Sequence, residues 1–246
     1  MKIAAIIPAR MASTRFPGKP LAKICGVPMI EHVRRRVSLC KKLDYVIVAT
    51  CDEEIYSTVT SNNGQACMTS NKHVRCTDRI AEASKNIDAD IIINVQGDEP
   101  MIMPNMIEEI IKIFDNEKIS CVNLISYIKD QSEFENHNVI KTVIDKNGRI
   151  LYFSRSPIPS KWNGNFNYYK QVGMIGFKKD LLFTFNSLKP TPLEIIESID
   201  MLRLLEHGYS INASISNYTS YGVDTTEDLI KVNNLMKKDF LYNKYK

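Results

Sequence analysis

The first twenty-one residues place a short apolar stretch directly before a basic loop. Residues 3–7 are apolar and end at Pro8, and the loop that follows contains Arg10, Arg15 and Lys19 among Ala, Ser, Pro and Gly. The apolar stretch is typical of a buried strand, and in open α/β sheets ligands bind at the carboxyl ends of strands. Cations beside exposed backbone N–H groups at that edge favour a polyphosphate ligand. The alternative is a strand followed by a basic surface loop whose cations are solvated.

The composition is that of a globular protein large enough for one α/β domain. The chain has 246 residues, of which 44% are hydrophobic and 24% charged, with a net charge of +4. We interpret the basic runs at 34–36 and in the tail as solvated helix faces, and expect no nucleic-acid partner. No apolar run has the length of a signal peptide or a membrane span, so we expect no membrane partner. Six cysteines without a CxxC pair favour free thiols and a cytoplasmic protein.

Strands and helices are predicted to alternate through the first half of the chain. Apolar runs predict strands at 45–50, 66–68, 91–95 and 121–125. Helical spacing and acidic first turns predict helices at 28–37, from 52, from 77 and at 105–114, with Thr77 as an N-cap. Such alternation is typical of a doubly wound, mostly parallel sheet in an α/β fold.

The pattern changes near residue 130. Runs at 139–145 and 149–153 flank an Asn147-Gly148 turn, which predicts a β-hairpin, and a further strand is expected at 172–177. A helix at 193–207, a strand at 211–215 and a helix at 225–238 complete the chain. We therefore predict a single domain over 1–246 with a β-rich extension at about 130–190.

Two aspartates are candidates for a metal site. Asp98 follows the most hydrophobic predicted strand, at the sheet edge expected for the 8–21 loop, where it could pair with a cation or bind Mg²⁺. Asp224 precedes the last helix, and its alternative role is the N-cap of that helix. Mg²⁺ commonly takes one or two carboxylates plus substrate phosphates, so the pair suits a metal, although their spacing does not establish that they meet.

A phosphate-binding loop with carboxylates and without nucleophilic machinery favours phosphoryl or nucleotidyl transfer, since that chemistry depends on positioning and charge neutralisation. The loop is not a GxxxxGK[ST] motif and no GxGxxG follows the first strand, which disfavours an ordinary kinase and dinucleotide redox chemistry. His32, His137 and His207 are expected on the surface or in helices. For His73, which precedes Thr77, a place in the site and a structural place remain open.

These motifs together resemble one family, the 3-deoxy-manno-octulosonate (Kdo) cytidylyltransferases or CMP-Kdo synthetases. The matching stretches run along the whole chain in the family's order, at 7–21, 94–102, 151–159, 192–194 and 222–229. The resemblance implies a Rossmann-like fold of the nucleotide-diphospho-sugar transferase type, with a β-rich dimerisation extension. It also implies a homodimer, the substrates CTP and a small acidic acceptor, and Mg²⁺.

The resemblance also implies roles for particular side chains. The catalytic residues would be Arg10, Arg15, Lys19 and Asp98. The nucleotide would be held by Pro8, Ala9, Arg10, Ser13, Lys19, Arg75, Gln96 and Asp98. The acceptor would contact Arg155, Gln171, Glu197 and Asp200, with Arg155 pairing with its carboxylate. The metal ligands would be Asp98 and Asp224.

The chain also departs from the family's pattern. The family usually has His-x-Ser-Gly-Thr-x-Arg, whereas this chain has Arg75-Cys76 in place of Ser-Gly; Gln171, Ile175 and Met201 replace a His, a Tyr and a Gln. Losing groups that read sugar hydroxyls favours a changed acceptor, and Arg75 could suit a more anionic one. CMP transfer to a Kdo-like acid for a bacterial surface polysaccharide is the main hypothesis. The alternatives are another acid, such as an amino-Kdo or a small phosphonate, and a non-catalytic nucleotide-binding regulator.

Overall fold

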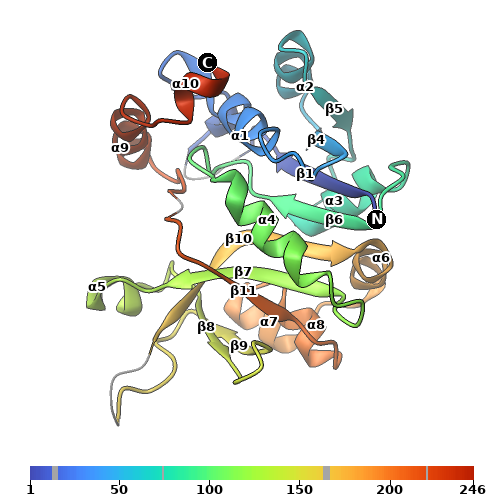
Figure 1. The fold of residues 1–246 in the computed structure, drawn as a ribbon, viewed down its shortest axis with the longest axis vertical. Coiled ribbons are helices and arrows are strands. Elements are labelled where there is room, and N and C mark those ends of the chain that lie inside the picture. The colour runs from blue at the N-terminus through green and yellow to red at the C-terminus, as the bar shows by residue number, and fades with distance from the viewer. Residues whose placement is uncertain (13–15, 74, 163–166, 220) are drawn as a thin grey trace. The chain divides into compact units, whose positions relative to one another are not determined.

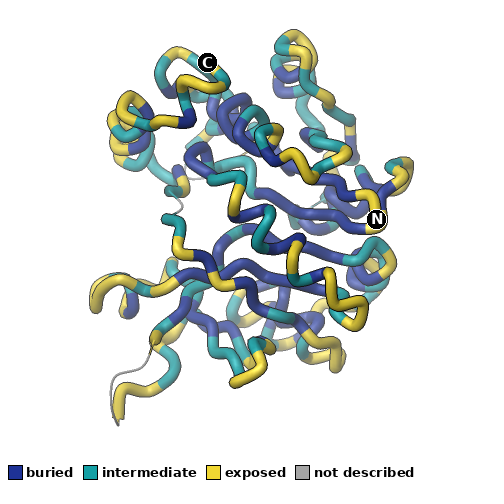
Figure 2. The backbone as a smooth tube through the Cα atoms, in the orientation of Figure 1, coloured by how far each residue is buried: buried dark blue, intermediate teal, exposed yellow. Residues whose placement is uncertain are grey.

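The strand β1 (Ile3–Ala9) lies inside a parallel sheet. The computed structural model describes residues 1–246 apart from 13–15, 74, 163–166 and 220. Every residue of β1 is buried, as the dark tube in Figure 2 shows. It pairs in parallel with β4 (Tyr45–Thr50) on one side and β6 (Ile91–Val95) on the other, and β4 pairs in parallel with β5 (Gln65–Met68). A strand buried on both faces is typical of a parallel sheet covered by helices.

The chain separates into two compact units. The first contains Met1–Glu108 and Ser220–Lys246, and the second Glu109–Thr219. In the first unit, α1 (Met29–Val37) packs on β1 and β4, and α3 (Cys76–Ser84) packs on β1, β4 and β6. The other regular elements of this unit are η1 (Lys19–Leu21), β2 (Lys23–Ile24), β3 (Val27–Pro28), α2 (Glu53–Ser61), α9 (Thr226–Met236) and α10 (Tyr242–Tyr245), labelled where there is room in Figure 1. The boundary between the units falls inside α4 (Pro104–Ile113).

The second unit contains a mixed sheet. Its strand β7 (Cys121–Tyr127) pairs in parallel with β11 (Asn212–Ser216) and antiparallel with β10 (Tyr169–Lys178). The predicted hairpin is confirmed, because β8 (Lys141–Ile144) and β9 (Ile150–Ser154) pair antiparallel across the Asn147-Gly148 turn. The helices of this unit are α5 (Gln131–Glu135), α6 (Lys179–Ser187), α7 (Pro192–Glu197) and α8 (Leu202–Glu206). The β-rich character expected for 130–190 is therefore observed, while the prediction of a single domain over 1–246 stays a prediction.

Two of the predicted helices differ in the structure, and a further helix was missed. The helix expected at 193–207 is divided into α7 and α8, because Ser198 takes a left-handed conformation (φ 53°) that ends the first of them. Thr77 lies inside α3 rather than at its N-cap, which is Arg75, and its side chain is buried. The helix α6 was not predicted, although Leu181, Leu182 and Phe185 give it an apolar face.

The basic run on α1 is not a solvated face. Arg36 is fully buried, donates to the Ile102 carbonyl oxygen (2.6 Å) and pairs with Asp239 (2.8 Å). Arg34 and Arg35 both donate to the buried carboxylate of Glu31, at 2.7 and 2.9 Å. Paired arginines can be buried in this way because each charge has a partner and its N–H groups are hydrogen-bonded.

His32 lies in the helix α1, in agreement with the expected place on the surface or in a helix, and it is fully buried there. Its Nε2 donates to the Ile24 carbonyl oxygen (2.7 Å), and its Nδ1 lies 2.9 Å from the Tyr245 hydroxyl. Burial lowers the pKa of His32 below its ordinary value, and the charges of Arg36 and Arg35 lower it further. The ring is therefore neutral in the folded protein near pH 7.

Across the described ranges, no helix combines the length and the apolar character needed to cross a membrane.

Candidate active site

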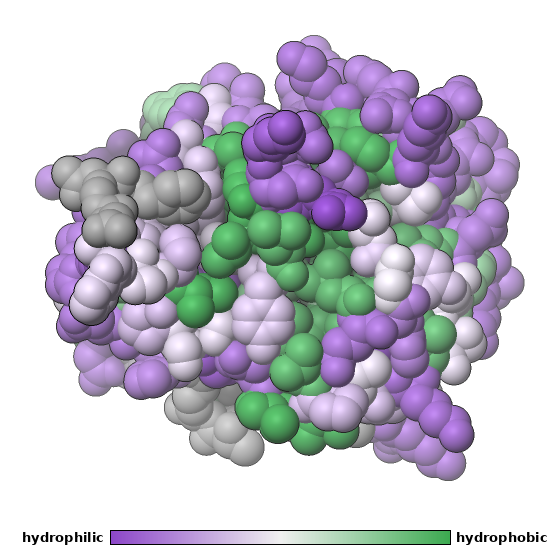
Figure 3. Space-filling model, turned by 90° about the horizontal axis from the view of Figure 1, so that it is seen from below, coloured by the Kyte–Doolittle hydropathy of each residue, from purple (hydrophilic) through white to green (hydrophobic). Residues whose placement is uncertain are grey.

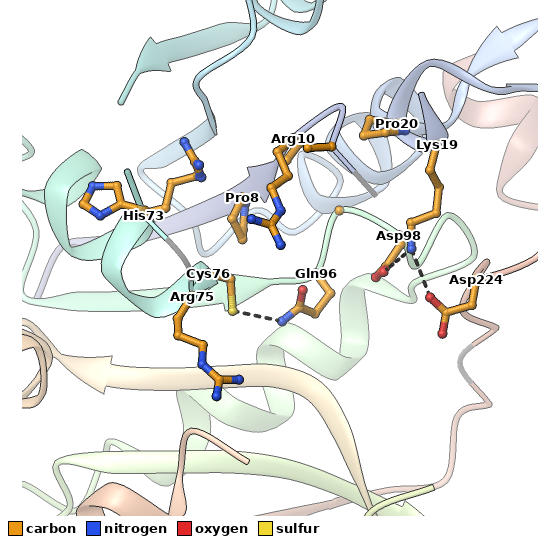
Figure 4. A pocket seen from close by; sticks show the side chains of 14 residues that line it. Pro8, Arg10, Lys19, Pro20, His73, Arg75, Cys76, Gln96, Asp98 and Asp224 are labelled. Carbon is orange, nitrogen blue, oxygen red and sulfur yellow. Dashed lines mark hydrogen bonds and ion pairs between the residues drawn. The ribbon is translucent and has the colours of Figure 1, made fainter. Parts of the chain in front are cut away.

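A cavity of about 350 Å³ opens at the carboxyl ends of β1 and β6, within the first unit. It contains most of the nucleotide-binding residues expected from the sequence, as Figure 4 shows. Its lining consists of Pro8, Ala9, Arg10, Ala12, Lys19, Pro20, His73, Arg75, Cys76, Arg79, Gln96, Gly97, Asp98 and Asp224. The sheet edge predicted to bind a polyphosphate is therefore a basic cavity with two carboxylates at one end.

The basic loop is held in place by backbone contacts. Gly18 has a left-handed conformation (φ 72°), which suits glycine, and its N–H donates to the Met11 carbonyl oxygen (3.2 Å). Met11 N–H donates to Asp52 Oδ2 (2.8 Å), which anchors the loop to the segment after β4. These contacts close the loop on itself and present Lys19 on the first residue of η1.

The strand ends meet closely at Gly97. A Cβ atom at this position would lie 2.7 Å from the Pro8 carbonyl oxygen, and the next nearest atom would be Ile30 Cδ1 at 3.4 Å. Since the Pro8 oxygen belongs to the backbone of β1, only a strand shift would make room. Gly97 therefore fixes the spacing between the carboxyl ends of β1 and β6, and with it the positions of Gln96 and Asp98.

Asp98 and Asp224 converge on one cation. Lys19 Nζ donates to Asp98 Oδ2 at 2.7 Å and to Asp224 Oδ1 at 3.1 Å (dashed in Figure 4). Burial lowers the pKa of the Lys19 ammonium, but the two carboxylates together outweigh burial and raise that pKa above its ordinary value. Lys19, Asp98 and Asp224, which come from distant parts of the sequence, thus form one charged cluster.

Asp224 is not the N-cap of the last helix. Thr225 has that role, because its hydroxyl accepts from Asp228 N–H (3.2 Å) while the Asp228 carboxylate accepts from Thr225 N–H (3.0 Å). This reciprocal arrangement is a capping box. It leaves the Asp224 carboxylate directed at Lys19 and the cavity, so the alternative structural reading of Asp224 is wrong.

The two carboxylates suit a magnesium ion bound together with a substrate. Their oxygens already surround one cation, the Lys19 ammonium, and both residues line the cavity. Within the described residues, no cluster of three or more His, Cys, Asp or Glu side chains could hold a metal by itself. Mg²⁺ typically takes one or two carboxylates and completes its shell with water and phosphate oxygens. Asp98 and Asp224 therefore fit this ion, provided that a polyphosphate supplies further ligands.

The opposite end of the cavity is formed by the start of α3. The Gln96 amide donates to Cys76 Sγ (3.5 Å), and Arg75 and His73 line the cavity near them. His73, whose place the sequence left open, thus lies in the site, where its Nε2 contacts the Glu82 carboxylate. Arg79 extends from the next turn of α3 and donates to Cys51 Sγ (3.5 Å). Cys76 and Arg79 were not predicted as lining residues. The available signal was the group of charged and polar residues at 73–79, close in sequence to the start of a predicted helix.

The residues expected to bind the acceptor lie in the second unit. The Arg155 side chain donates through Nε to the Glu197 carbonyl oxygen (2.7 Å), while the Glu197 carboxylate accepts from Ser154 Oγ (2.7 Å) and Arg155 N–H (2.9 Å). Gln171 donates to Asn123 Oδ1 (2.6 Å). Arg155 and Glu197 therefore form one cluster after β9, with Asp200 between α7 and α8 and Gln171 on β10.

The buried Lys141 supports this cluster. Its ammonium donates to the backbone oxygens of Asn136 (2.9 Å), Val139 (2.6 Å) and Arg155. Burial lowers the pKa of Lys141, and the nearby Arg155 charge lowers it further.

Comparison with known proteins identifies the family. The cytidylyltransferase family model matches residues 4–213. A 3-deoxy-manno-octulosonate cytidylyltransferase of Geobacter metallireducens is 47% identical over 94% of this chain and 96% of its own length. Another, from Fusobacterium nucleatum, is 45% identical over 97% of this chain and 98% of its own length.

This chain belongs to the 3-deoxy-manno-octulosonate cytidylyltransferase family.

A solved member of this family agrees with the fold. The structure described as CMP:2-keto-3-deoxy-manno-octonic acid synthetase complexed with CTP superposes with a TM-score of 0.93 at 37% identity, covering 97% of this chain and 99% of that one. The predicted family, nucleotidyltransferase class and α/β fold with a mostly parallel sheet are confirmed.

The family's expected loop residues are only partly described. Pro8, Ala9, Arg10 and Lys19 line the cavity together with Arg75, Gln96, Asp98 and Asp224. Ser13 and Arg15 lie outside the described residues, and their predicted roles stay predictions.

Proposed function

We propose that this chain transfers CMP from CTP to 3-deoxy-manno-octulosonate and releases pyrophosphate. The observation that carries the proposal is the cavity at the ends of β1 and β6, where the cationic loop faces two converging carboxylates. Relatives at 42–47% identity carry this enzyme name over nearly their whole length. The alternatives that the departures from the family pattern suggested, another acid acceptor or a non-catalytic regulator, are not favoured by these comparisons.

The reaction is a displacement at the α-phosphorus of CTP. The anomeric hydroxyl oxygen of the acceptor forms the new bond to phosphorus, the bond from that phosphorus to the bridging oxygen breaks, and the hydroxyl proton passes to solvent. Negative charge accumulates on the departing pyrophosphate. Such chemistry needs positioning and neutralisation of charge more than a protein nucleophile, which suits a cavity with Arg10, Lys19 and Arg75 in its wall.

Each side chain has a task set by its position. Arg10 and Lys19 would hold phosphate oxygens, and Gln96, fixed by its contact with Cys76, would frame the nucleoside. Asp98 and Asp224 would hold Mg²⁺, which when bound supplies charge neutralisation for the phosphates. Arg155 would pair with the acceptor's carboxylate, since a guanidinium matches a carboxylate with two parallel hydrogen bonds.

A pyrophosphate-release assay tests the proposal. The purified chain is incubated with CTP, Mg²⁺ and one acid at a time: Kdo, its 8-amino analogue, a sialic-type acid and a small phosphonate. We expect Kdo to give the highest kcat/KM. Pyrophosphate release with another acid but not with Kdo would show that the other acid is the acceptor. No pyrophosphate release with any acid, despite CTP binding, would favour a non-catalytic nucleotide-binding regulator.

We also propose that the chain acts as a homodimer through the second unit. Seen from the side of β8 and β9, hydrophobic side chains gather across the middle of the surface (Figure 3). Exposed apolar residues of this unit include Ile196, which is 78% exposed, and Ile195 on α7 and Leu151 on β9. Large exposed apolar patches commonly mark contact surfaces.

We place the reaction in the cytoplasm, where its product would supply the synthesis of a surface polysaccharide. All six cysteines are free thiols, which is typical of a reducing compartment.

A further inference from the structure

The Lys19 ammonium occupies the space between the two carboxylates that suit a metal. Its Nζ lies 2.7 Å from Asp98 Oδ2 and 3.1 Å from Asp224 Oδ1. The Lys19 side chain is only 12% exposed, whereas Asp98 and Asp224 are 34% and 46% exposed and open to the cavity. In Figure 4 the lysine reaches down from η1 to both carboxylates, at the end of the cavity away from His73.

We propose that Lys19 is a placeholder that keeps a divalent cation out of the Asp98–Asp224 site until a triphosphate draws the lysine away. The inference rests on the proposed function and adds an order of events to it. The nucleotide-free protein binds the metal weakly. When CTP binds, its phosphates bind the Lys19 ammonium, and the metal enters the site together with CTP. The lysine thus has two alternative anionic partners, its own carboxylates and the substrate.

The charges explain why the two cations exclude each other. The Lys19 ammonium compensates one of the two carboxylate charges, so a metal ion that approaches the cluster meets a net charge of only −1. The ammonium also occupies the position between the carboxylates that the metal ion would take. Like charges this close repel strongly in a partly desolvated site. A triphosphate carries more charge than the two carboxylates, and the flexible four-carbon stem lets the ammonium follow it.

The exchange couples metal and nucleotide. If the nucleotide raises metal affinity by releasing Lys19, then by linkage the metal raises nucleotide affinity by the same factor. Without the lysine, the carboxylate pair would bear two uncompensated charges and would bind free divalent cations even when no substrate is present. The inference therefore predicts that removing this positive charge from the cavity wall makes metal binding tighter.

Metal titration of nucleotide-free protein tests this directly. Mn²⁺ is the probe, with free Mn²⁺ measured by electron paramagnetic resonance. We expect Lys19→Gln to bind Mn²⁺ on the order of tenfold more tightly than the unaltered chain, the scale for removing one charge from a partly exposed site. Equal or weaker Mn²⁺ binding by Lys19→Gln would overturn the proposal.

Matched variants separate the placeholder from general electrostatics. Arg10→Gln removes the same charge from the same cavity, but in Figure 4 its side chain points toward Gln96, and we expect a much smaller change. Lys19→Arg keeps the charge and should bind Mn²⁺ as weakly as the unaltered chain. Adding Asp224→Asn to Lys19→Gln should remove the gain. Equal gains from Arg10→Gln and Lys19→Gln would reject a local placeholder.

A second measurement uses the unaltered chain. Acetylation of Lys19 by brief exposure to acetic anhydride, followed by peptide mass spectrometry, should rise when Mg²⁺ at high concentration displaces the ammonium from its carboxylates. No rise at metal saturation would overturn the proposal even if Lys19→Gln did not fold. Because neither readout uses turnover, loss of the placeholder effect with intact Kdo-dependent pyrophosphate release rejects only this inference, whereas the converse result rejects only the proposed reaction.

Discussion

Asp98 carries one of the two carboxylates that we propose to hold Mg²⁺. Asp98→Asn keeps the size of the side chain and the backbone bond from Val223 N–H to the Asp98 carbonyl oxygen, so the fold should remain. We expect kcat/KM for CMP transfer to fall roughly 100-fold or more, because an amide is a poor ligand for Mg²⁺ and a neutral partner for Lys19.

The measurement is pyrophosphate release at increasing Mg²⁺, with the exposed Asp115→Asn as a matched control. Undiminished release from Asp98→Asn would contradict the role of this carboxylate.

Cys76 places a thiol inside the proposed nucleotide site. Cys76→Ala should raise KM for CTP a few-fold, about 2- to 10-fold, because the Gln96 amide loses its partner at 3.5 Å and is less well positioned. Alkylation of Cys76 by iodoacetamide should be slowed by CTP, as followed by peptide mass spectrometry. Cys67→Ala, which lines a different cavity, is the control and should leave KM unchanged. An alkylation rate that does not change with CTP would show that Cys76 lies outside the nucleotide site.

At the residue scale, the sequence located many of the side chains that line the cavity at the ends of β1 and β6. The cations after the first strand and Asp98 after another strand were found because parallel strands end at the same edge. The convergence of Asp98 with Asp224 could not be read from the sequence, because no local pattern fixes the distance between two loops. The burial of Arg36 was missed for the same reason, because its partner Asp239 comes from the other end of the chain. His32 was expected on the surface or in a helix, and its burial beside Tyr245 had no local signal either.

At the scale of elements, α1 carries a buried titratable group. Burial and the charges of Arg36 and Arg35 hold the pKa of His32 below its ordinary value of 6.5. As the pH falls below 6.5, the unfolded chain takes up this proton before the folded one does, so the free energy of unfolding should decrease until the folded ring is protonated as well.

The test is urea unfolding at about pH 7.5 and about pH 5.5. The loss of stability between these two values should be smaller in His32→Gln than in the unaltered chain, whereas the exposed His207→Gln should behave like the unaltered chain. An identical loss in His32→Gln would show that His32 does not contribute.

Regular elements were predicted where the pattern was long and unbroken. The strands β1, β4 and β6 were found from their apolar runs, and α1 from its helical spacing. The division of 193–207 at Ser198 was missed, because a left-handed serine has no strong sequence signal comparable to glycine. Whether Asp224 caps α9 or binds a metal was left open, since Asp224 and Thr225 are both good caps; the structure shows that Thr225 is the N-cap and that Asp224 pairs with Lys19.

At the scale of the whole molecule, the homodimer proposal makes a simple prediction. Ile196 lies on α7 with most of its side chain exposed, and an Ile196→Asp substitution would place a charge on the proposed contact surface. We expect this variant to sediment as a monomer, because burying an unpaired carboxylate is costly.

Analytical ultracentrifugation of both proteins checks the result, with Ile230→Asp on α9 as a control of similar exposure. A monomeric unaltered chain would contradict the homodimer. Dissociation by Ile230→Asp but not by Ile196→Asp would place the contact on α9 instead.

The fold class could be predicted because strand and helix patterns alternate over half of the chain, and the motif order supplied the rest. What the sequence could not give is the grouping into two compact units with a boundary inside α4, since a helix without a break shows no change of composition there.

The close approach at Gly97 limits how this protein can vary. The position is partly accessible to solvent, so burial alone would suggest that many substitutions are tolerated. Yet even alanine would press its methyl group against the Pro8 carbonyl oxygen, so any substitution at residue 97 requires the strand β1 to shift. Gly148, by contrast, has open space where a Cβ would lie, and only its left-handed backbone disfavours other residues. In a library of all single variants selected for activity, position 97 should therefore stay nearly invariant, like the core, although water can reach it.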